Sequence, residues 1–214
     1  MSETAARRLA HMFDAVSAAV EADRDRLSEL DGAIGDGDHG TTMALGFQTV
    51  RSELSKLNLD EADISAVLNT AATAFINAVG ASTGPLYATG FRRAAQATAG
   101  CDDLDLATSA AILDAIGVGI RERGHGQRGD KTMLDAWLPA AEAAQAAVAE
   151  NRSSAEFWDK VVSAATAGAN TTRSMIATKG RAARLRERSL GHMDPGAASA
   201  VIILQAMATA AKNW

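Results

Sequence analysis

Three aspartates and a histidine lie close together in the glycine-rich stretch that runs from Asp31 to Met43: Asp31, Asp36, Asp38 and His39. Clustered carboxylates repel one another unless a cation or water neutralises them, and hard divalent cations such as magnesium or calcium prefer oxygen ligands. The intervening glycines let the backbone approach a ligand closely. The stretch is therefore typical of a divalent-cation site, although a solvated acidic turn has the same composition.

An EF-hand does not fit this stretch. Its twelve-residue loop needs oxygen ligands at positions 1, 3 and 5 and a glutamate at position 12. Counted from Asp31, those later positions hold Ala33, Gly35 and Thr42, and counting from Asp36 fails in the same way. What remains is a flexible carboxylate loop followed directly by a helix N-terminus. That arrangement suits a metal bridged to a phosphate that sits on helix amides.

Composition limits the class of protein. The 214-residue chain has a formal net charge of -5 and a sequence pI of about 5.4, which argues against a nucleic-acid or anionic-membrane binder. Its one cysteine, Cys101, permits no intrachain disulfide and favours a reducing compartment. The N-terminus does not read as a signal peptide, and no apolar stretch is long enough to span a membrane. We expect a soluble cytoplasmic protein.

Apolar residues recur at helical spacing along the whole chain, with no strong strand alternation. Alanine-rich composition with only 4% aromatic residues also favours helices that approach closely. We expect one all-α domain over residues 1–214, in which Pro139 kinks the sixth helix or shifts its start. The pattern predicts eight helices, at about 3 to the high twenties, 41–56, 64–79, 85–99, 106–120, 134–148, 154–177 and around 201–207.

The connections after the first, third, fifth and seventh of these helices are the polar, functional-looking ones. They cover approximately residues 31–40, 80–85, 124–133 and 179–196. In an up-and-down array of helices, alternate connections lie at the same end. We therefore expect all four to converge on one rim and to form a composite site.

At these four connections the chain resembles the nucleotide-binding L subunit of bacterial dihydroxyacetone kinases, which is also the C-terminal domain of single-chain versions. The motifs that carry the resemblance are Gly35-Asp-Gly-Asp-His-Gly40, Gly84-Pro-Leu-Tyr87, Gly129-Asp-Lys-Thr-Met133, and Lys179-Gly-Arg181 with Glu187-Arg-Ser-Leu-Gly-His-Met-Asp-Pro-Gly196. The resemblance spans essentially the whole chain. It implies an antiparallel eight-helix barrel with ADP or ATP bound at one rim.

The resemblance also implies two magnesium ions held by Asp31, Asp36 and Asp38. It implies nucleotide contacts from all four connections, namely His39, Gly40, Thr41, Thr42, Ser82, Thr83, Gly124, Met133, Arg181, Asp194, Pro195 and Gly196. The keto-sugar of the family is attached to a histidine of a separate K-type subunit. The phosphoryl donor is either ATP or a phosphotransferase-system protein that rephosphorylates a bound ADP. No residue here stands out as a catalytic base, which fits a donor subunit.

The chain departs from the family pattern in places. Thr42 stands where asparagine is usual, Arg186 where glycine is common, and Thr178 where a basic residue is usual. The connection at 80–84 carries hydroxyl side chains in place of small residues. These differences leave the three aspartates intact, but they affect the edge of the expected nucleotide site and the surface that would meet the other subunit. The identity of the sugar and of the partner therefore stays open.

The sequence is compatible with two functions. The first is the phosphoryl-donor subunit of a kinase for dihydroxyacetone or a related short ketose. The alternative is a regulatory module that senses ADP and acts on a transcription factor without turnover. The arginines between 181 and 188 are read as a nucleotide lid or a subunit-docking surface, because the acidic whole disfavours nucleic acid. We expect the side chain of Tyr87 either to line the rim or to pack in the core.

Overall fold

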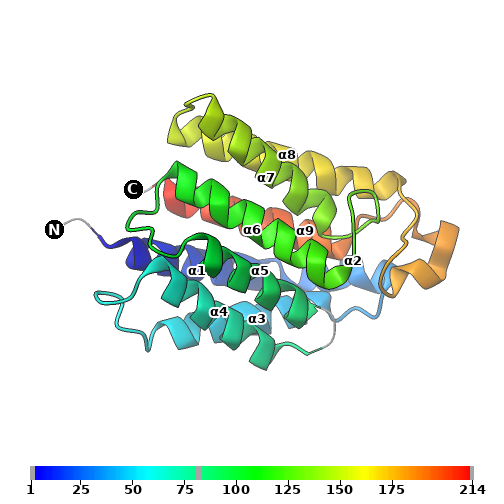
Figure 1. The fold of residues 1–214 in the computed structure, drawn as a ribbon. Helices are drawn as coiled ribbons and strands as arrows, with labels where there is room; N and C mark the ends of the chain where they lie inside the picture. The colour runs from blue at the N-terminus through cyan, green and yellow to red at the C-terminus, as the bar shows by residue number, and fades with distance from the viewer. Residues whose placement is uncertain (1–2, 81–82, 213–214) are drawn as a thin grey trace.

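The computed structural model describes residues 3–80 and 83–212, and all regular structure in these ranges is helical, as predicted (Figure 1). The helices are α1 (Ala5–Ala22), α2 (Arg24–Ile34), α3 (His39–Leu54), α4 (Ile64–Ala78), α5 (Thr83–Ala97), α6 (Leu106–Gly124), α7 (Leu134–Ala149), α8 (Ser154–Thr171) and α9 (Pro195–Ala211). Two 3-10 segments, η1 (Thr172–Ser174) and η2 (Ala182–Ser189), lie between α8 and α9.

Eight of the described helices form a closed ring, which confirms the expected helical barrel. From α3 to α9 each helix packs against the next one along the chain, and α1 closes the ring by packing against both α3 and α9. The remaining helix, α2, is short and packs on α3 and α9. Figure 1 shows α2 and the segment around η2 at one end of the ring, with both chain termini at the other.

The first predicted helix is in fact two helices. The chain turns at Asp23, so that α1 ends at Ala22 and Asp31 lies in the last turns of α2 rather than in a loop. The periodicity does not reveal this break because Val20, Leu27 and Ile34, all buried, keep a seven-residue spacing across it. Seven residues are close to two helical turns, so the apolar pattern reads as one helix.

Several other helix boundaries differ by a few residues from the sequence expectation, and two of them affect the site region. Helix α3 begins at His39 rather than Thr41, and α8 ends at Thr171 instead of Ala177. Pro139 lies inside α7, where it cannot donate a hydrogen bond to the carbonyl of Asp135. Gly168 of α8 packs against that carbonyl, since a Cβ atom at position 168 would lie 1.8 Å from its oxygen.

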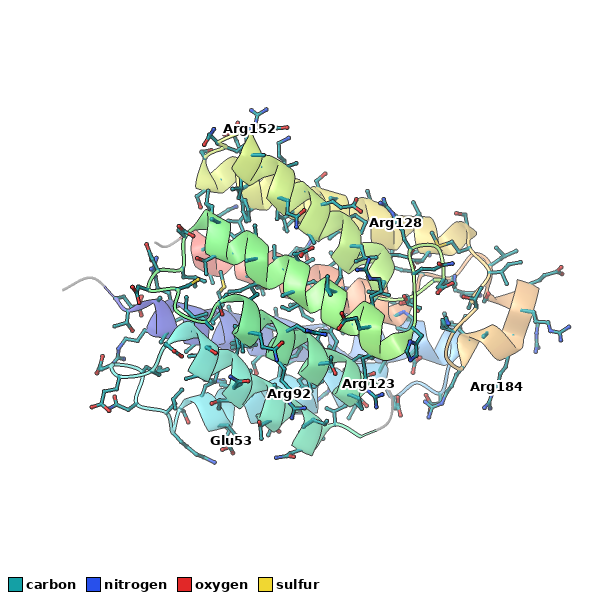
Figure 2. The ribbon with its side chains drawn as sticks, in the orientation of Figure 1. Glu53, Arg92, Arg123, Arg128, Arg152 and Arg184 are labelled. Carbon is teal, nitrogen blue, oxygen red and sulfur yellow. The ribbon has the colours of Figure 1, made fainter. Side chains whose placement is uncertain are left out.

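The middle of the ring is filled by aromatic side chains from several helices. Phe47, Phe75, Tyr87 and Phe91 contact one another with ring centroids 5.2–6.5 Å apart, mostly edge to face. Trp137 joins this cluster through Tyr87. Such pairs add stability beyond the area that they bury. The charged side chains labelled in Figure 2 lie on the outside of the ring. Within the described residues no helix is long and apolar enough to cross a bilayer.

Candidate functional site

A cavity of about 860 Å³ opens at the end of the ring that carries α2 and η2. All four of the polar connections contribute to its lining, although they are far apart in sequence. Of the residues singled out from the sequence, those that line the cavity are Asp31, Asp38, His39, Thr42, Thr83, Gly124, Met133, Arg181, Asp194, Pro195 and Gly196.

Four of the singled-out residues are not in this lining. Asp36 lies beside it, next to Asp31 and Asp38. Gly40 faces α2 instead, because a Cβ atom there would lie 1.9 Å from the carbonyl oxygen of Arg24. Thr41 is exposed on the first turn of α3. Ser82 lies outside the described residues.

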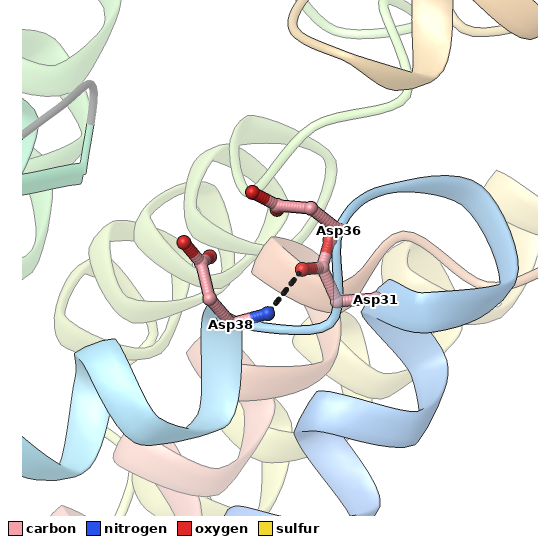
Figure 3. A group of neighbouring side chains, drawn as sticks. All are labelled: Asp31, Asp36 and Asp38. Carbon is pink, nitrogen blue, oxygen red and sulfur yellow. Dashed lines mark hydrogen bonds between the residues drawn. The ribbon is translucent and has the colours of Figure 1, made fainter.

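The three aspartates form a compact group at the cavity edge (Figure 3). Each offers a carboxylate oxygen, and these oxygens all lie within 4.8 Å of one another. Asp31 Oδ2 accepts hydrogen bonds from the backbone N–H groups of Asp38 and His39, at 3.0 and 3.3 Å. Gly37 allows the intervening turn with a φ of +80°, which other residues rarely adopt.

The electrostatics of this group favour a cation. Partial burial and the neighbouring charge of Asp36 raise the pKa of the Asp38 carboxyl group above its ordinary value. Arg181 supplies positive charge: its Nη1 donates a hydrogen bond to Asp36 Oδ1 and lies 3.8 Å from Asp38 Oδ2. Three carboxylates at this spacing fit a hard divalent cation such as Mg²⁺.

His39 is the first residue of α3 and is 9% exposed. Its Nε2 lies 2.9 Å from the hydroxyl oxygen of Ser199 on α9. Burial lowers the pKa of His39, opposed by the charge of Asp31 and by a hydrogen bond with the Pro195 carbonyl. The imidazole ring of His39 is thus held at the cavity wall between the N-terminal ends of α3 and α9. It is in its neutral form at neutral pH.

Asp194 begins α9 and caps it. Its Oδ2 accepts a hydrogen bond from the backbone N–H of Ala197 at 2.7 Å, and Pro195 occupies the first helical turn. Burial raises the pKa of Asp194 to about 7, although the Ala197 hydrogen bond opposes that shift. Position 196 favours glycine, because a Cβ atom there would make a tight contact of 3.0 Å with Asp194 Oδ2.

Lys131 is a residue of the site whose role the sequence did not reveal. Only 1% of it is exposed, and its Nζ donates to the carbonyl oxygens of Thr172 and His192 at 2.6 and 2.5 Å. Burial lowers the pKa of its ammonium group. Lys131 therefore fastens the connection before α7 to the segment before α9. Its position inside the Gly129–Met133 motif marked it as a candidate site residue, but the motif does not predict that the Lys131 side chain is buried.

Asp135 fastens the same connection from inside α7. Its two carboxylate oxygens accept hydrogen bonds from the backbone N–H groups of Gly129 and Thr132, at 2.6 and 2.8 Å. The side chain is 1% exposed, so these bonds replace the water that a carboxylate would otherwise bind. The cavity lining also includes apolar side chains, among them Leu45, Val79, Leu86, Ile120 and Leu134.

Comparison with known proteins shows which family the chain resembles. Residues 33–209 match the DAK2 domain. The chain is 38% identical over 187 residues to the ADP-binding subunit DhaL of the PEP-dependent dihydroxyacetone kinase from Escherichia coli, a match that covers 87% of this chain and 88% of that subunit. It is 35% identical over 198 residues to the corresponding subunit of dihydroxyacetone kinase 2 from Listeria innocua, covering 91% and 89% of the two chains.

A solved structure shows the same fold. The dihydroxyacetone kinase from C. freundii, crystallised with AMP-PNP and Mg²⁺, superposes with a TM-score of 0.71 at 25% sequence identity. The superposition covers 94% of this chain and 33% of the kinase, so this chain spans about a third of that protein's length.

The chain therefore belongs to the DAK2-domain family of proteins. Within the family it is a kinase subunit, similar over most of its length to the DhaL-type ADP-binding subunits of dihydroxyacetone kinases.

Proposed function

We propose that the chain binds ADP or ATP together with magnesium in this cavity and donates the phosphoryl group to dihydroxyacetone or a related short ketose. The sugar is carried by a separate K-type kinase subunit. The observation that carries the proposal is the convergence of four polar connections on one cavity, with three carboxylates within 4.8 Å of one another at its edge. The names of the relatives, which are ADP-binding kinase subunits, support the same conclusion.

In this proposal Asp31, Asp36 and Asp38 hold two magnesium ions. Bound magnesium supplies charge neutralisation for the phosphate oxygens, which phosphoryl transfer needs more than it needs acid–base chemistry. The first-turn amides of a helix have no partners within the helix and favour anions. In α3 the Thr42 N–H already donates to the Asp38 carbonyl, so it is the amides of Gly40 and Thr41 that suit the phosphates. Arg181 offers a planar group of donors to the same oxygens.

The remaining cavity residues suit the nucleoside. The apolar wall that includes Leu86, Ile120 and Leu134 provides a surface on which a purine base can pack. Met133 and Gly124 continue this wall, while Thr83 and the Asp194–Gly196 turn add polar groups at its edge. We therefore assign the base to the α5–α6–α7 side of the cavity and the phosphates to the α3 side.

The phosphoryl donor is either ATP or a nucleotide that a phosphotransferase-system protein recharges. The relatives from E. coli and L. innocua are named as PEP-dependent, which supports the second source, whereas AMP-PNP in the C. freundii kinase supports the first. Mass spectrometry of gently purified protein separates them. ADP that stays bound through purification indicates recharging in place, and a readily exchanging site indicates ATP as a consumed donor.

Activity is tested by mixing the protein with a K-type sugar-bearing subunit, dihydroxyacetone and a donor, and by measuring sugar phosphate. The proposal expects product only when both subunits are present. Product from the isolated chain would contradict the assignment of the sugar to another subunit. Tight ADP binding with no transfer to any K-type partner would favour the ADP-sensing regulatory module instead.

A further inference from the structure

The segment between α8 and α9, residues 172–194, carries Arg181 to the edge of the cavity. It contains only the two 3-10 stretches η1 and η2, and Figure 1 shows it standing out from the end of the ring. Short 3-10 stretches have poor hydrogen-bond geometry, so they do not fix the position of a chain by themselves. The contacts that hold this segment therefore decide where Arg181 lies.

The two ends of the segment lie side by side and form a neck. The Gly191 N–H donates to the carbonyl oxygen of Arg173 at 2.8 Å, and the Asp194 N–H donates to Thr172 Oγ1 at 3.0 Å. The segment is thus a closed loop, and its neck is the point at which it leaves the ring.

Lys131 reaches into this neck from the connection before α7. Its ammonium group donates to the Thr172 carbonyl on one side of the neck and to the His192 carbonyl on the other, at 2.6 and 2.5 Å. A buried ammonium group is costly unless it is hydrogen-bonded, so both partners matter to it. The Lys131 backbone has a φ of +61°, a left-handed conformation that residues other than glycine rarely adopt. Such strain persists only where the surrounding contacts impose it.

Asp130 holds a second point of the segment, close to Arg181. The backbone N–H of Thr178 donates to the Asp130 carbonyl oxygen at 3.2 Å, and the Thr178 hydroxyl group donates to Asp130 Oδ1 at 2.7 Å. Asp130 Oδ2 accepts a hydrogen bond from the Gln127 N–H at 2.9 Å, which fixes the carboxylate. Only two residues separate Thr178 from Arg181. Asp130 and Lys131 therefore hold the segment both at its neck and just before Arg181.

Neither the ring nor Arg181 itself explains where the segment lies. The ring closes without these contacts, because α8 packs directly against α7 and α9. The side chains of the Arg181–Asp36 ion pair are 57% and 43% exposed, and pairs this exposed contribute little to stability. Asp130 and Lys131, by contrast, are 8% and 1% exposed, so water does not compete for their hydrogen bonds.

We propose that Asp130 and Lys131 are positioning residues that hold Arg181 at the edge of the cavity, beside the three clustered aspartates. Lys131 fixes the neck of the segment, while Asp130 fixes the short stretch that leads to Arg181. The consequence for nucleotide binding rests on the proposed function, in which Arg181 contacts the phosphates.

Hydrogen exchange, measured by mass spectrometry on the ligand-free full chain, tests the anchoring. Lys131→Met removes both bonds to the neck, and Thr178→Val removes the hydroxyl bond to Asp130. Both should speed amide exchange in peptides from residues 173–191, about three- to tenfold for Thr178→Val and more for Lys131→Met. In Thr178→Val the exchange of the ring helices should not change. Thr73→Val is the matched control, because Thr73 is also exposed and its hydroxyl group donates to a carbonyl, within α4.

Mn²⁺ binding to the nucleotide-free protein gives a readout whose sign separates positioning from damage to the fold. The guanidinium of Arg181 competes with a cation for the Asp36 carboxylate, so a loosened segment should strengthen Mn²⁺ binding. Thr178→Val and Lys131→Met should raise the affinity by up to about fivefold, whereas a purely structural loss would lower it. In an Arg181→Met background the same substitutions should leave the Mn²⁺ affinity unchanged.

Calorimetric titration with ADP and Mg²⁺ measures the consequence for the proposed function. Thr178→Val and Lys131→Met should each weaken binding, by no more than Arg181→Met does, and should cause no further loss in the Arg181→Met background. A full additional loss in that background would show that these residues act on the fold rather than through Arg181, and would overturn the proposal.

Thr178→Val decides the matter if Lys131→Met does not fold. A Thr178→Val protein whose segment exchange and Mn²⁺ affinity both match those of Thr73→Val would overturn the positioning role. A wild-type protein that does not bind ADP with Mg²⁺ would instead overturn the proposed function. The exchange and Mn²⁺ measurements, which need no nucleotide, would then still support or overturn the positioning of Arg181.

Discussion

Arg181 donates a hydrogen bond to Asp36, a residue 145 positions earlier in the chain. The same guanidinium lies 3.8 Å from Asp38, so one cationic side chain balances two of the three clustered carboxylates. Arg181 precedes η2, and its side chain is 57% exposed. Exposed ion pairs contribute little to stability. A divalent cation can therefore displace Arg181 from Asp36 at a small cost in free energy.

Replacement of Arg181 by methionine should therefore raise the affinity of the nucleotide-free protein for Mn²⁺. Removal of a competing surface cation corresponds to an increase of about two- to fivefold. Electron paramagnetic resonance of free Mn²⁺ measures the effect, and Arg188→Met on the same segment is the control. The same Arg181 variant should bind ADP with Mg²⁺ more weakly, because a phosphate ligand is lost. Unchanged or weaker Mn²⁺ binding would show that the guanidinium does not compete.

Asp36→Asn should weaken magnesium-dependent nucleotide binding at least tenfold, on the order of the loss seen when groups around a metal are removed. Its side chain is exposed, so the helical circular dichroism should stay unchanged. Glu53→Gln, a partly exposed acid at the end of α3 away from the cavity, should leave binding unaffected. A folded Asp36→Asn variant with the nucleotide affinity of the wild type would contradict the role of Asp36.

Gly40→Ala should destabilise the fold through the contact between α2 and α3. The added Cβ atom would meet the Arg24 carbonyl, and overpacking of this kind costs about 1–3 kcal/mol. Thr41→Ala is exposed and should stay within about 0.5 kcal/mol of the wild type in urea unfolding. Equal stability of the two variants would mean that α2 moves away from α3 without cost.

The free energy of unfolding should depend on pH through the ionisation of Asp194. Its pKa is raised to about 7 in the folded protein, so the folded state holds a proton that the unfolded state has released between about pH 4 and 7. Stability should therefore fall as pH rises through this window, by up to a few kcal/mol, and change little above it.

Asp194→Asn isolates this contribution in chelator-treated protein. The amide oxygen can still accept from the Ala197 N–H, so the cap of α9 is kept. The variant should gain stability relative to the wild type at pH 8 compared with pH 5. Parallel pH profiles of the two proteins would contradict the raised pKa.

The helical class, the ring and the meeting of the four connections follow from short-range signals in the sequence. Apolar spacing marks each helix, and alternation of the helices brings every second connection to one end. The break at Asp23 leaves no such signal, because buried residues on either side keep helical phase.

Long-range pairings were beyond sequence reasoning. The contact of Arg181 with Asp36 and the burial of Lys131 depend on how distant segments fold over the rim. Tyr87 shows the same limit: its motif predicted either the rim or the core, and only the structure places it in the core, where its hydroxyl group accepts a hydrogen bond from Trp137. Periodicity reports which face is buried, but not which polar groups meet there.

The most direct measurement is a crystal structure of the protein with ADP and Mn²⁺, using the anomalous signal of manganese to locate the cation. The account predicts anomalous density among Asp31, Asp36 and Asp38, phosphates at the start of α3, and the Arg181 guanidinium displaced from Asp36. Nucleotide bound elsewhere on the chain, or bound in this cavity with no anomalous density beside the three aspartates, would contradict it.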